Sequence, residues 1–120
     1  YGNTEGIVTE QTPCEPISNY GTSKCTLEQY FKTTKRNTII LRLFNVYGAT
    51  ENTTRYIDGI IENIEKAQSE FIIWGEKTRD FVHILDVVQA IQKSMGYIFT
   101  YKEDSFIKIF NVGSCFGTSL

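Results

Sequence analysis

Short apolar runs rich in β-forming residues alternate along this chain with segments of helical periodicity. The runs are TIILRLF at 38–44, FIIW at 71–74, DFVHIL at 80–85 and IKIFNVGS at 107–114. Isoleucines recur at three- and four-residue spacings over 53–68, as they do on one apolar helix face. Strands that alternate with helices are typical of a parallel sheet covered by helices. The chain is therefore expected to adopt an α/β fold.

Capping residues indicate where the helices begin. Ser18 is a good N-cap for a helix that continues to about Lys35. Asp86 can cap a helix over VVQAIQKSM, residues 87–95. Thr118–Ser119 is a further helix-start signal at the end of the sequence, with no helix after it, which indicates a piece of a longer protein.

Composition narrows the function classes. With 120 residues, 41% of them hydrophobic, the chain can bury a modest core as one domain. Its net charge of −2 and the absence of a basic run argue against nucleic-acid binding, and no apolar run approaches the roughly 20 residues of a membrane helix. Cys14, Cys25 and Cys115 are odd in number and widely spaced. We therefore expect no disulfide framework and no metal site, and a cytoplasmic location.

Four separated stretches carry a family resemblance. They are TEQTPCEPISNYGTSK at 9–24, LRLFNVYGA at 41–49, TRDFVHILDVVQA at 78–90 and IFNVGSCFGTS at 109–119. Each is weak alone, but together and in this order they resemble the extended short-chain dehydrogenase/reductase family, and specifically its NAD-dependent sugar-nucleotide epimerase/dehydratase branch. The family usually has proline where this chain has Ala49, so no substrate contact is assigned just beyond that position.

The resemblance implies part of a Rossmann-like doubly wound parallel sheet with a segment of the smaller substrate-binding region. Residues 1–48 would be the C-terminal half of the NAD-binding domain, and 49–79 a substrate-binding segment. Residues 80–120 would supply the return strand and helix that lead into a truncated C-terminal substrate region. The sequence contains no G-x-x-G-x-x-G motif, the loop that holds dinucleotide phosphates. We therefore expect these 120 residues alone to bind the cofactor poorly and to show no turnover.

Tyr20 and Lys24 match the family's catalytic pair. Four residues apart on a helix, they lie one turn apart on the same face. A free phenol has a pKa near 10, and lowering it by about three units requires roughly 4 kcal/mol of preferential phenolate stabilisation. A nearby ammonium and the oxidised nicotinamide can supply that energy. In the family the matching lysine also binds the nicotinamide ribose, so both residues count as cofactor-binding too. The alternative is a solvated tyrosine beside an exposed lysine.

Phe44 is the last residue of the expected strand at 38–44, and Asn45 follows it directly. Ligands of parallel α/β folds bind at this carboxyl end of the strands. Asn45 matches a family asparagine that contacts the substrate diphosphate, and Phe44 would form one wall of the nicotinamide pocket. The alternatives are a core phenylalanine and a turn asparagine, because Asn45 and Gly48 favour a turn after the strand.

Arg79 matches a family arginine that grips the diphosphate, a task suited to a guanidinium fork. Its alternative is a surface arginine paired with a carboxylate. Trp74 lies where relatives hold the nucleotide base, or else belongs to the core. Asp80 and His83 are assigned structural roles.

The leading hypothesis is an enzyme in which NAD oxidises C4 of a nucleotide sugar and returns hydride to the other face, a 4-epimerase. NADP-dependent 4-keto-sugar reduction and 4,6-dehydration stay open, because the residues that discriminate them would precede Tyr1. A non-catalytic nucleotide-sugar-binding relative and an unrelated α/β domain are further alternatives. The resemblance also implies a homodimer in the intact protein.

Overall fold

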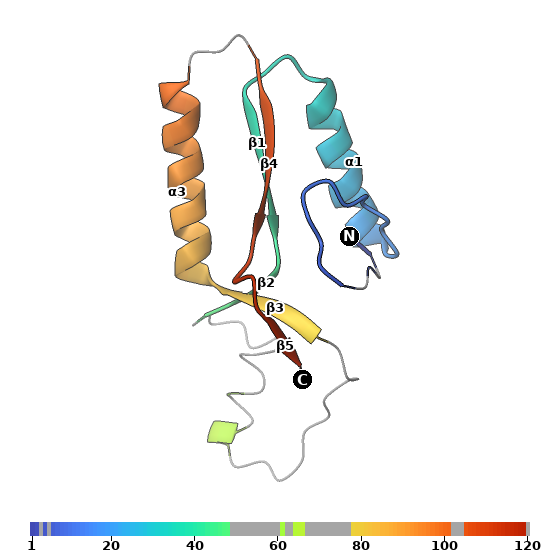
Figure 1. Ribbon diagram of the computed structural model, residues 1–120, viewed down its shortest axis with the longest axis vertical. Coiled ribbons are helices and arrows are strands. Elements are labelled where there is room, and N and C mark those ends of the chain that lie inside the picture. Colours follow the sequence, from blue (N-terminus) through green and yellow to red (C-terminus); the bar gives the residue numbers. More distant parts are fainter. Residues whose placement is uncertain are drawn as a thin grey trace. The chain divides into compact units, whose positions relative to one another are not determined.

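A computed structural model describes residues 1–2, 4, 6–48, 61, 64–66, 78–101 and 105–119. The described parts of the expected helix at 53–68 are helical at residues 61, 64 and 65. The expected strand at 71–74 lies outside the described residues. The elements, drawn in Figure 1, are α1 (Asn19–Thr33), β1 (Thr38–Leu43), β2 (Asn45–Tyr47), β3 (Thr78–His83), α3 (Ile84–Thr100), β4 (Ile107–Val112) and β5 (Gly117–Ser119).

Two of the three strand pairs in the described part of the chain run parallel. In the β1–β4 pair, the backbone N–H of Thr38 donates to the carbonyl of Phe106, and six residues later that of Phe44 donates to Val112. Both partners advance together, which is the pattern of a parallel ladder. β2 is parallel to β3, and β5 is antiparallel to β3. The expected α/β class with parallel strands is confirmed.

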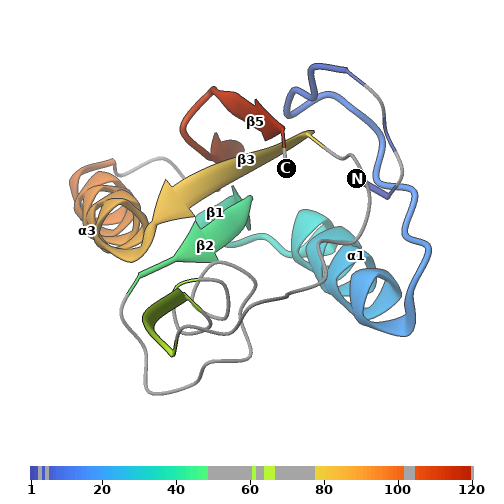
Figure 2. The same ribbon diagram turned by 90° about the horizontal axis from the view of Figure 1, so that it is seen from below.

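By packing, the described chain divides into two compact units. The first comprises 1–42 and 93–111, and the second 43–92 and 112–120. In the first unit, α1 lies on one side of the β1–β4 pair and the C-terminal half of α3 on the other (Figures 1 and 2). Phe106 is buried there. The second unit holds the β2–β3–β5 sheet, and Val82 and Val87 are the buried hydrophobic side chains among its described residues. The expected functional boundaries at 48 and 79 stay a prediction.

The start of α1 confirms the predicted cap. Ser18 has an extended backbone, and its hydroxyl accepts the N–H of Gly21 at 3.0 Å. The helix ends at Thr33, two residues before the expected Lys35. The hydroxyl and N–H of Thr34 both donate to the carbonyl of Phe31, which satisfies one of the last helical acceptors.

The prediction that Asp86 caps the next helix is wrong. α3 already begins at Ile84, and β3 ends at His83 rather than two residues later. The imidazole Nδ1 of His83 accepts the N–H of Leu85 at 3.3 Å, so a histidine takes the capping role. Asp86 lies in the first turn, where its negative charge suits the helix dipole.

Two expectations for the polar segments are also corrected. Asn45 does not begin a turn: 45–47 form β2, held by pairing with β3, and the chain turns only at Gly48, whose φ is +140°. The segment around Thr118–Ser119 does not start a helix but forms β5, with Thr118 opposite Arg79. In both places sheet pairing satisfies backbone groups that a turn or cap would otherwise serve.

Candidate functional site

α1 brings Tyr20 and Lys24 together. The ammonium nitrogen of Lys24 lies 5.2 Å from the centre of the Tyr20 ring, within the range of a cation–π contact. Both side chains are exposed, Tyr20 to 74%. A phenol and an ammonium thus share one environment, open to an incoming ligand. Their catalytic roles stay a prediction.

β2 and β3 bring Asn45 and Arg79 together. Nη1 of Arg79 donates to the amide oxygen of Asn45 at 3.5 Å, and the amide nitrogen of Asn45 donates to the backbone carbonyl of Asp80 at 2.9 Å. The second bond fixes the orientation of the amide. An oriented amide beside a guanidinium is an arrangement suited to an anionic ligand such as a phosphate.

Asp80 organises the turn after β4. Its Oδ1 accepts from the N–H and the hydroxyl of Ser114, at 2.7 and 2.9 Å, and its Oδ2 accepts from the N–H of Cys115 at 3.0 Å. Gly113 fits because any side chain there would collide: a Cβ would lie 2.6 Å from Asp80 Oδ2 and 2.9 Å from the ring of Phe44. Asp80 therefore has a structural role, and Phe44 packs beside this turn.

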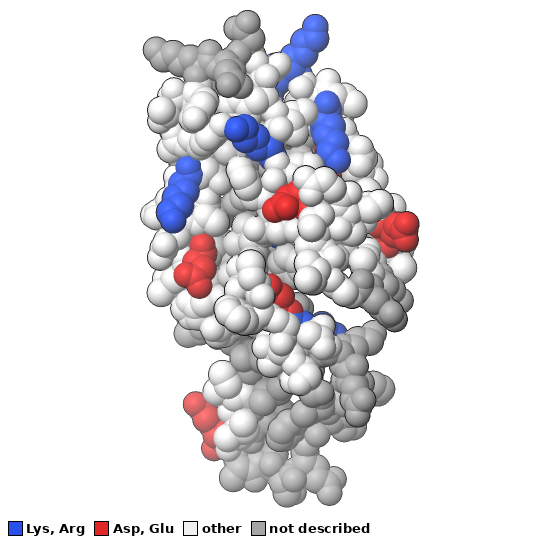
Figure 3. Space-filling model, in the orientation of Figure 1, with Lys and Arg blue, Asp and Glu red and all other residues white. Residues whose placement is uncertain are grey.

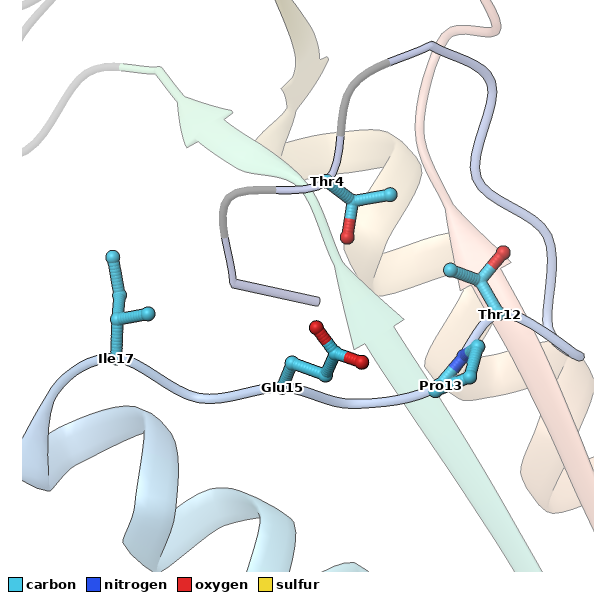
Figure 4. A pocket seen from close by; sticks show the side chains of 5 residues that line it. All are labelled: Thr4, Thr12, Pro13, Glu15 and Ile17. Atoms are coloured by element: carbon cyan, nitrogen blue, oxygen red, sulfur yellow. The ribbon is translucent and has the colours of Figure 1, made fainter.

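Trp74, the predicted contact to the nucleotide base, lies outside the described residues. A hollow of about 300 Å³ occurs on the N-terminal loop (Figure 4), where the side chain of Glu15 points toward Thr4. Its described lining is Thr4, Thr12, Pro13, Glu15 and Ile17, so none of the predicted site residues contributes to it.

The sequence analysis missed a buried ion pair behind the Tyr20–Lys24 pair. Glu28 is 8% exposed, and its carboxylate accepts from Nη2 and Nε of Arg42 at 2.6 and 2.9 Å. Lys32 adds a second cation at 2.9 Å. These contacts, with Arg42 first, lower the pKa of Glu28 from its usual 4.5 to about 2 although burial opposes the shift. The bonds to Glu28, and to a lesser extent the contact with Tyr1, raise the pKa of Arg42. The feature of the sequence that could have indicated this ion pair is Arg42 itself, a single arginine within the apolar run at 38–44.

Arg42 also binds the N-terminal loop. Its Nη1 donates to the hydroxyl of Tyr1 at 2.9 Å and to the carbonyl of Glu10 at 3.0 Å. The Tyr1 hydroxyl in turn donates to the side-chain oxygen of Asn111. The carboxylate of Glu10 accepts the N–H of Asn111 at 2.8 Å, and this bond lowers the pKa of Glu10. One guanidinium thus connects α1, β1 and the loop, and the loop is bonded to β4.

The face drawn in Figure 3 carries both basic and acidic side chains of the described residues, scattered over a mostly uncharged surface. Within the described ranges, none of the helices has the length and apolar character to cross a bilayer.

Comparison with known proteins places the chain in a family. Residues 1–113 match the NAD dependent epimerase/dehydratase family. A curated relative, the dTDP-L-rhamnose 4-epimerase of Burkholderia thailandensis, is 32% identical over 120 residues that include 92% of this chain. The chain belongs to the NAD-dependent epimerase/dehydratase family, as the four motifs indicated.

Solved structures share its fold. The UDP-glucuronic acid 4-epimerase of Bacillus cereus, in complex with UDP-glucuronic acid and NAD, matches 99% of this chain with a TM-score of 0.81 and 27% identity. The dTDP-glucose 4,6-dehydratase of Bacillus anthracis, in complex with NAD, matches 99% with a TM-score of 0.76 and 25% identity. The chain spans 38% of the length of each of these two, and 32% of the Burkholderia relative.

Proposed function

We propose that the whole protein is an NAD-dependent epimerase that inverts C4 of a nucleotide-activated sugar. The observation that carries the proposal is the contact between Tyr20 and Lys24, with the ammonium 5.2 Å from the centre of an exposed phenol ring. Family membership supports it, and so does the fold shared with a Bacillus cereus 4-epimerase bound to a UDP-sugar and NAD.

Tyr20 acts as the proton carrier in this proposal. Its phenolate takes the proton of the C4 hydroxyl as the C4–H bond is lost, and its phenol returns that proton after the other face is reduced. The ammonium of Lys24 stabilises the phenolate without giving up its own proton. NAD held beside Tyr20 and Lys24 would supply both the acceptor and the donor of the hydride, so the reaction would have no net oxidation.

The residues present fit part of a dinucleotide site. Lys24 has an exposed ammonium that can donate to ribose hydroxyls, and Tyr20 beside it is open to a ligand. Phe44 is proposed to line the nicotinamide pocket. NADP in place of NAD is the alternative cofactor, and a titration of the whole protein with both dinucleotides distinguishes them.

Asn45 and Arg79 are proposed to bind the substrate diphosphate. Their contact at 3.5 Å places an oriented amide next to a guanidinium on neighbouring strands, a donor set suited to phosphate oxygens. Trp74 is proposed, from the sequence alone, to contact the nucleotide base. Arg79→Lys in the whole protein should raise KM for the nucleotide sugar more than it lowers kcat, because a lysine cannot form the bidentate contact.

Sugar-nucleotide 4,6-dehydration is the second candidate, because a 4,6-dehydratase shares the fold at a TM-score of 0.76. The two are separated by exposing the whole protein to several nucleotide sugars in a thermal-shift assay and analysing the products by NMR. A C4 epimer supports the first function, and a 4-keto-6-deoxy sugar supports the second. If no nucleotide sugar stabilises the protein or is converted, both are refuted.

A homodimer formed through α1 is part of the proposal. Apolar side chains of α1 are exposed in this chain, including Leu27, Tyr30 and Phe31, and covering them in a dimer would be favourable. Sedimentation of the whole protein with and without Tyr30→Glu tests this. A cytoplasmic location is also proposed, because the three cysteines are odd in number and widely spaced, as in proteins without a disulfide framework.

A further inference from the structure

We infer that Glu28 and Arg42 are positioning residues for the Tyr20–Lys24 pair, an inference that rests on the proposed function. Among the described residues, Glu28 is the one charged side chain that is buried. Burying a carboxylate is costly unless it is paired and hydrogen-bonded. A helix residue held this way fixes the helix that carries it.

The spacing along α1 links the ion pair to the reacting groups. Tyr20, Lys24 and Glu28 follow one another at four-residue intervals and therefore form one ridge of the helix. Glu28 uses both carboxylate oxygens to bind two nitrogens of Arg42, at 2.6 and 2.9 Å. A two-point contact of this kind restricts both rotation of the helix about its axis and sliding along β1.

The third guanidinium nitrogen restrains Arg42 itself. Nη1 donates to the Tyr1 hydroxyl and to the Glu10 carbonyl, so Nε, Nη1 and Nη2 all have acceptors. The ring of Tyr1 lies 4.9 Å from the guanidinium carbon. The loop that leads into α1 is thus anchored to the same side chain as the middle of the helix.

The effect is geometric rather than electrostatic. Glu28 lies eight residues beyond Tyr20, which is about 12 Å along a helix and more than the roughly 8 Å Debye length at physiological salt. The carboxylate is moreover compensated by Arg42 and Lys32. Loss of the pair should therefore move the phenol relative to a bound substrate, and a shift of about 1 Å can cost on the order of 100-fold in rate.

The test uses the whole protein with Arg42→Met and Arg42→Lys. Arg42→Met should lower kcat at least tenfold, measured per cofactor-loaded enzyme, with KM and the pH dependence of kcat nearly unchanged. Arg42→Lys should fall in between, because an ammonium keeps the charge but not the two-point contact. Hydrogen exchange should accelerate in the peptide covering α1 and stay unchanged in the peptide covering α3.

Lys108→Met is the matched control for a general loss of stability. The ammonium of Lys108 lies 4.6 Å from the ring centre of Tyr97 and joins β4 to α3. At a temperature where every variant is folded, this control should keep its kcat even when its melting temperature falls. If Arg42→Met does not fold, kcat, KM, the pH dependence of kcat and hydrogen exchange in α1 are measured for Glu28→Gln and Arg42→Lys instead. These two variants then test the positioning role.

The outcomes separate the two claims. Unchanged kcat and unchanged exchange in α1 for the Arg42 variants, with an active wild type, would overturn the positioning role and leave the proposed function intact. A shifted pH profile would assign the pair an electrostatic role instead, and overturn the inference. If the wild type converts no nucleotide sugar, the proposed function fails, and exchange in α1 still shows whether Arg42 holds the helix.

Discussion

Neutralising Glu28 should produce a loss of stability that depends on pH in a calculable way. The structure lowers the pKa of this carboxyl from 4.5 to about 2 through its bonds to Arg42 and Lys32. A difference of about 2.5 units, at 1.36 kcal/mol per unit, corresponds to about 3 kcal/mol of stability at neutral pH. The side chain is 8% exposed, so solvent screening removes little of it.

The direction of this pH dependence follows from the lowered pKa of Glu28. A carboxyl whose pKa is lower in the folded state contributes fully above its unfolded pKa, and the contribution is lost as pH falls through the folded value. For Glu28 the window therefore runs from about pH 5 down to about pH 2. Glu28→Gln has no such titration, so the difference between wild type and variant should shrink from about 3 kcal/mol at pH 7 to about 1.4 kcal/mol at pH 3.

Urea unfolding of the whole protein, followed by circular dichroism between pH 3 and pH 7, measures that difference. Lys32→Gln is the control. The Lys32 side chain is 34% exposed and pairs with Glu28 at i,i+4, so its replacement should cost no more than about 0.5 kcal/mol. A difference for Glu28→Gln that stays constant over the whole pH range would refute the reasoning, because it would mean that Glu28 titrates alike in both states.

Three substitutions test the packing and the caps by thermal or urea unfolding. Gly113→Ala should cost at least about 2 kcal/mol, since its Cβ would lie 2.6 Å from a carboxylate oxygen of Asp80; a neutral effect would show that the turn relaxes freely. Gly96→Ala has open space around it and should instead stabilise α3 by about 0.5–1 kcal/mol. Ser18→Ala should cost about 1 kcal/mol, because the N–H of Gly21 loses its acceptor; no cost would argue against the cap.

The sequence predicted those elements whose determinants are local. The cap at Ser18 and the strands near 38–43 and 107–112 follow from residues a few positions apart, and the structure has them. The start of α3 was missed because the capping group is the imidazole of His83, a residue with weaker capping preference than the nearby Asp86. The strand at Gly117–Ser119 was missed because its conformation comes from pairing with β3, over 35 residues earlier.

The candidate site likewise contains contacts that follow from local sequence and contacts that depend on residues far apart in the chain. Tyr20 and Lys24 are one helical turn apart, so periodicity alone predicts their contact. Asn45 and Arg79 are 34 residues apart, and only the family resemblance connected them before their contact was seen. The pair of Glu28 with Arg42 depends on how α1 packs on β1. The sequence marks Arg42 alone, as the one arginine in the apolar run at 38–44, and gives no sign that Glu28 is its partner.

Replacement of Tyr20 by phenylalanine in the whole protein tests the central claim most directly. This change removes one hydroxyl from an exposed ring and leaves Lys24 in place. With a nucleotide sugar that the wild type epimerises, turnover should fall by about 100-fold to 10,000-fold while NAD stays bound. Turnover within a few-fold of the wild type would contradict the assignment of Tyr20 as the group that carries the proton.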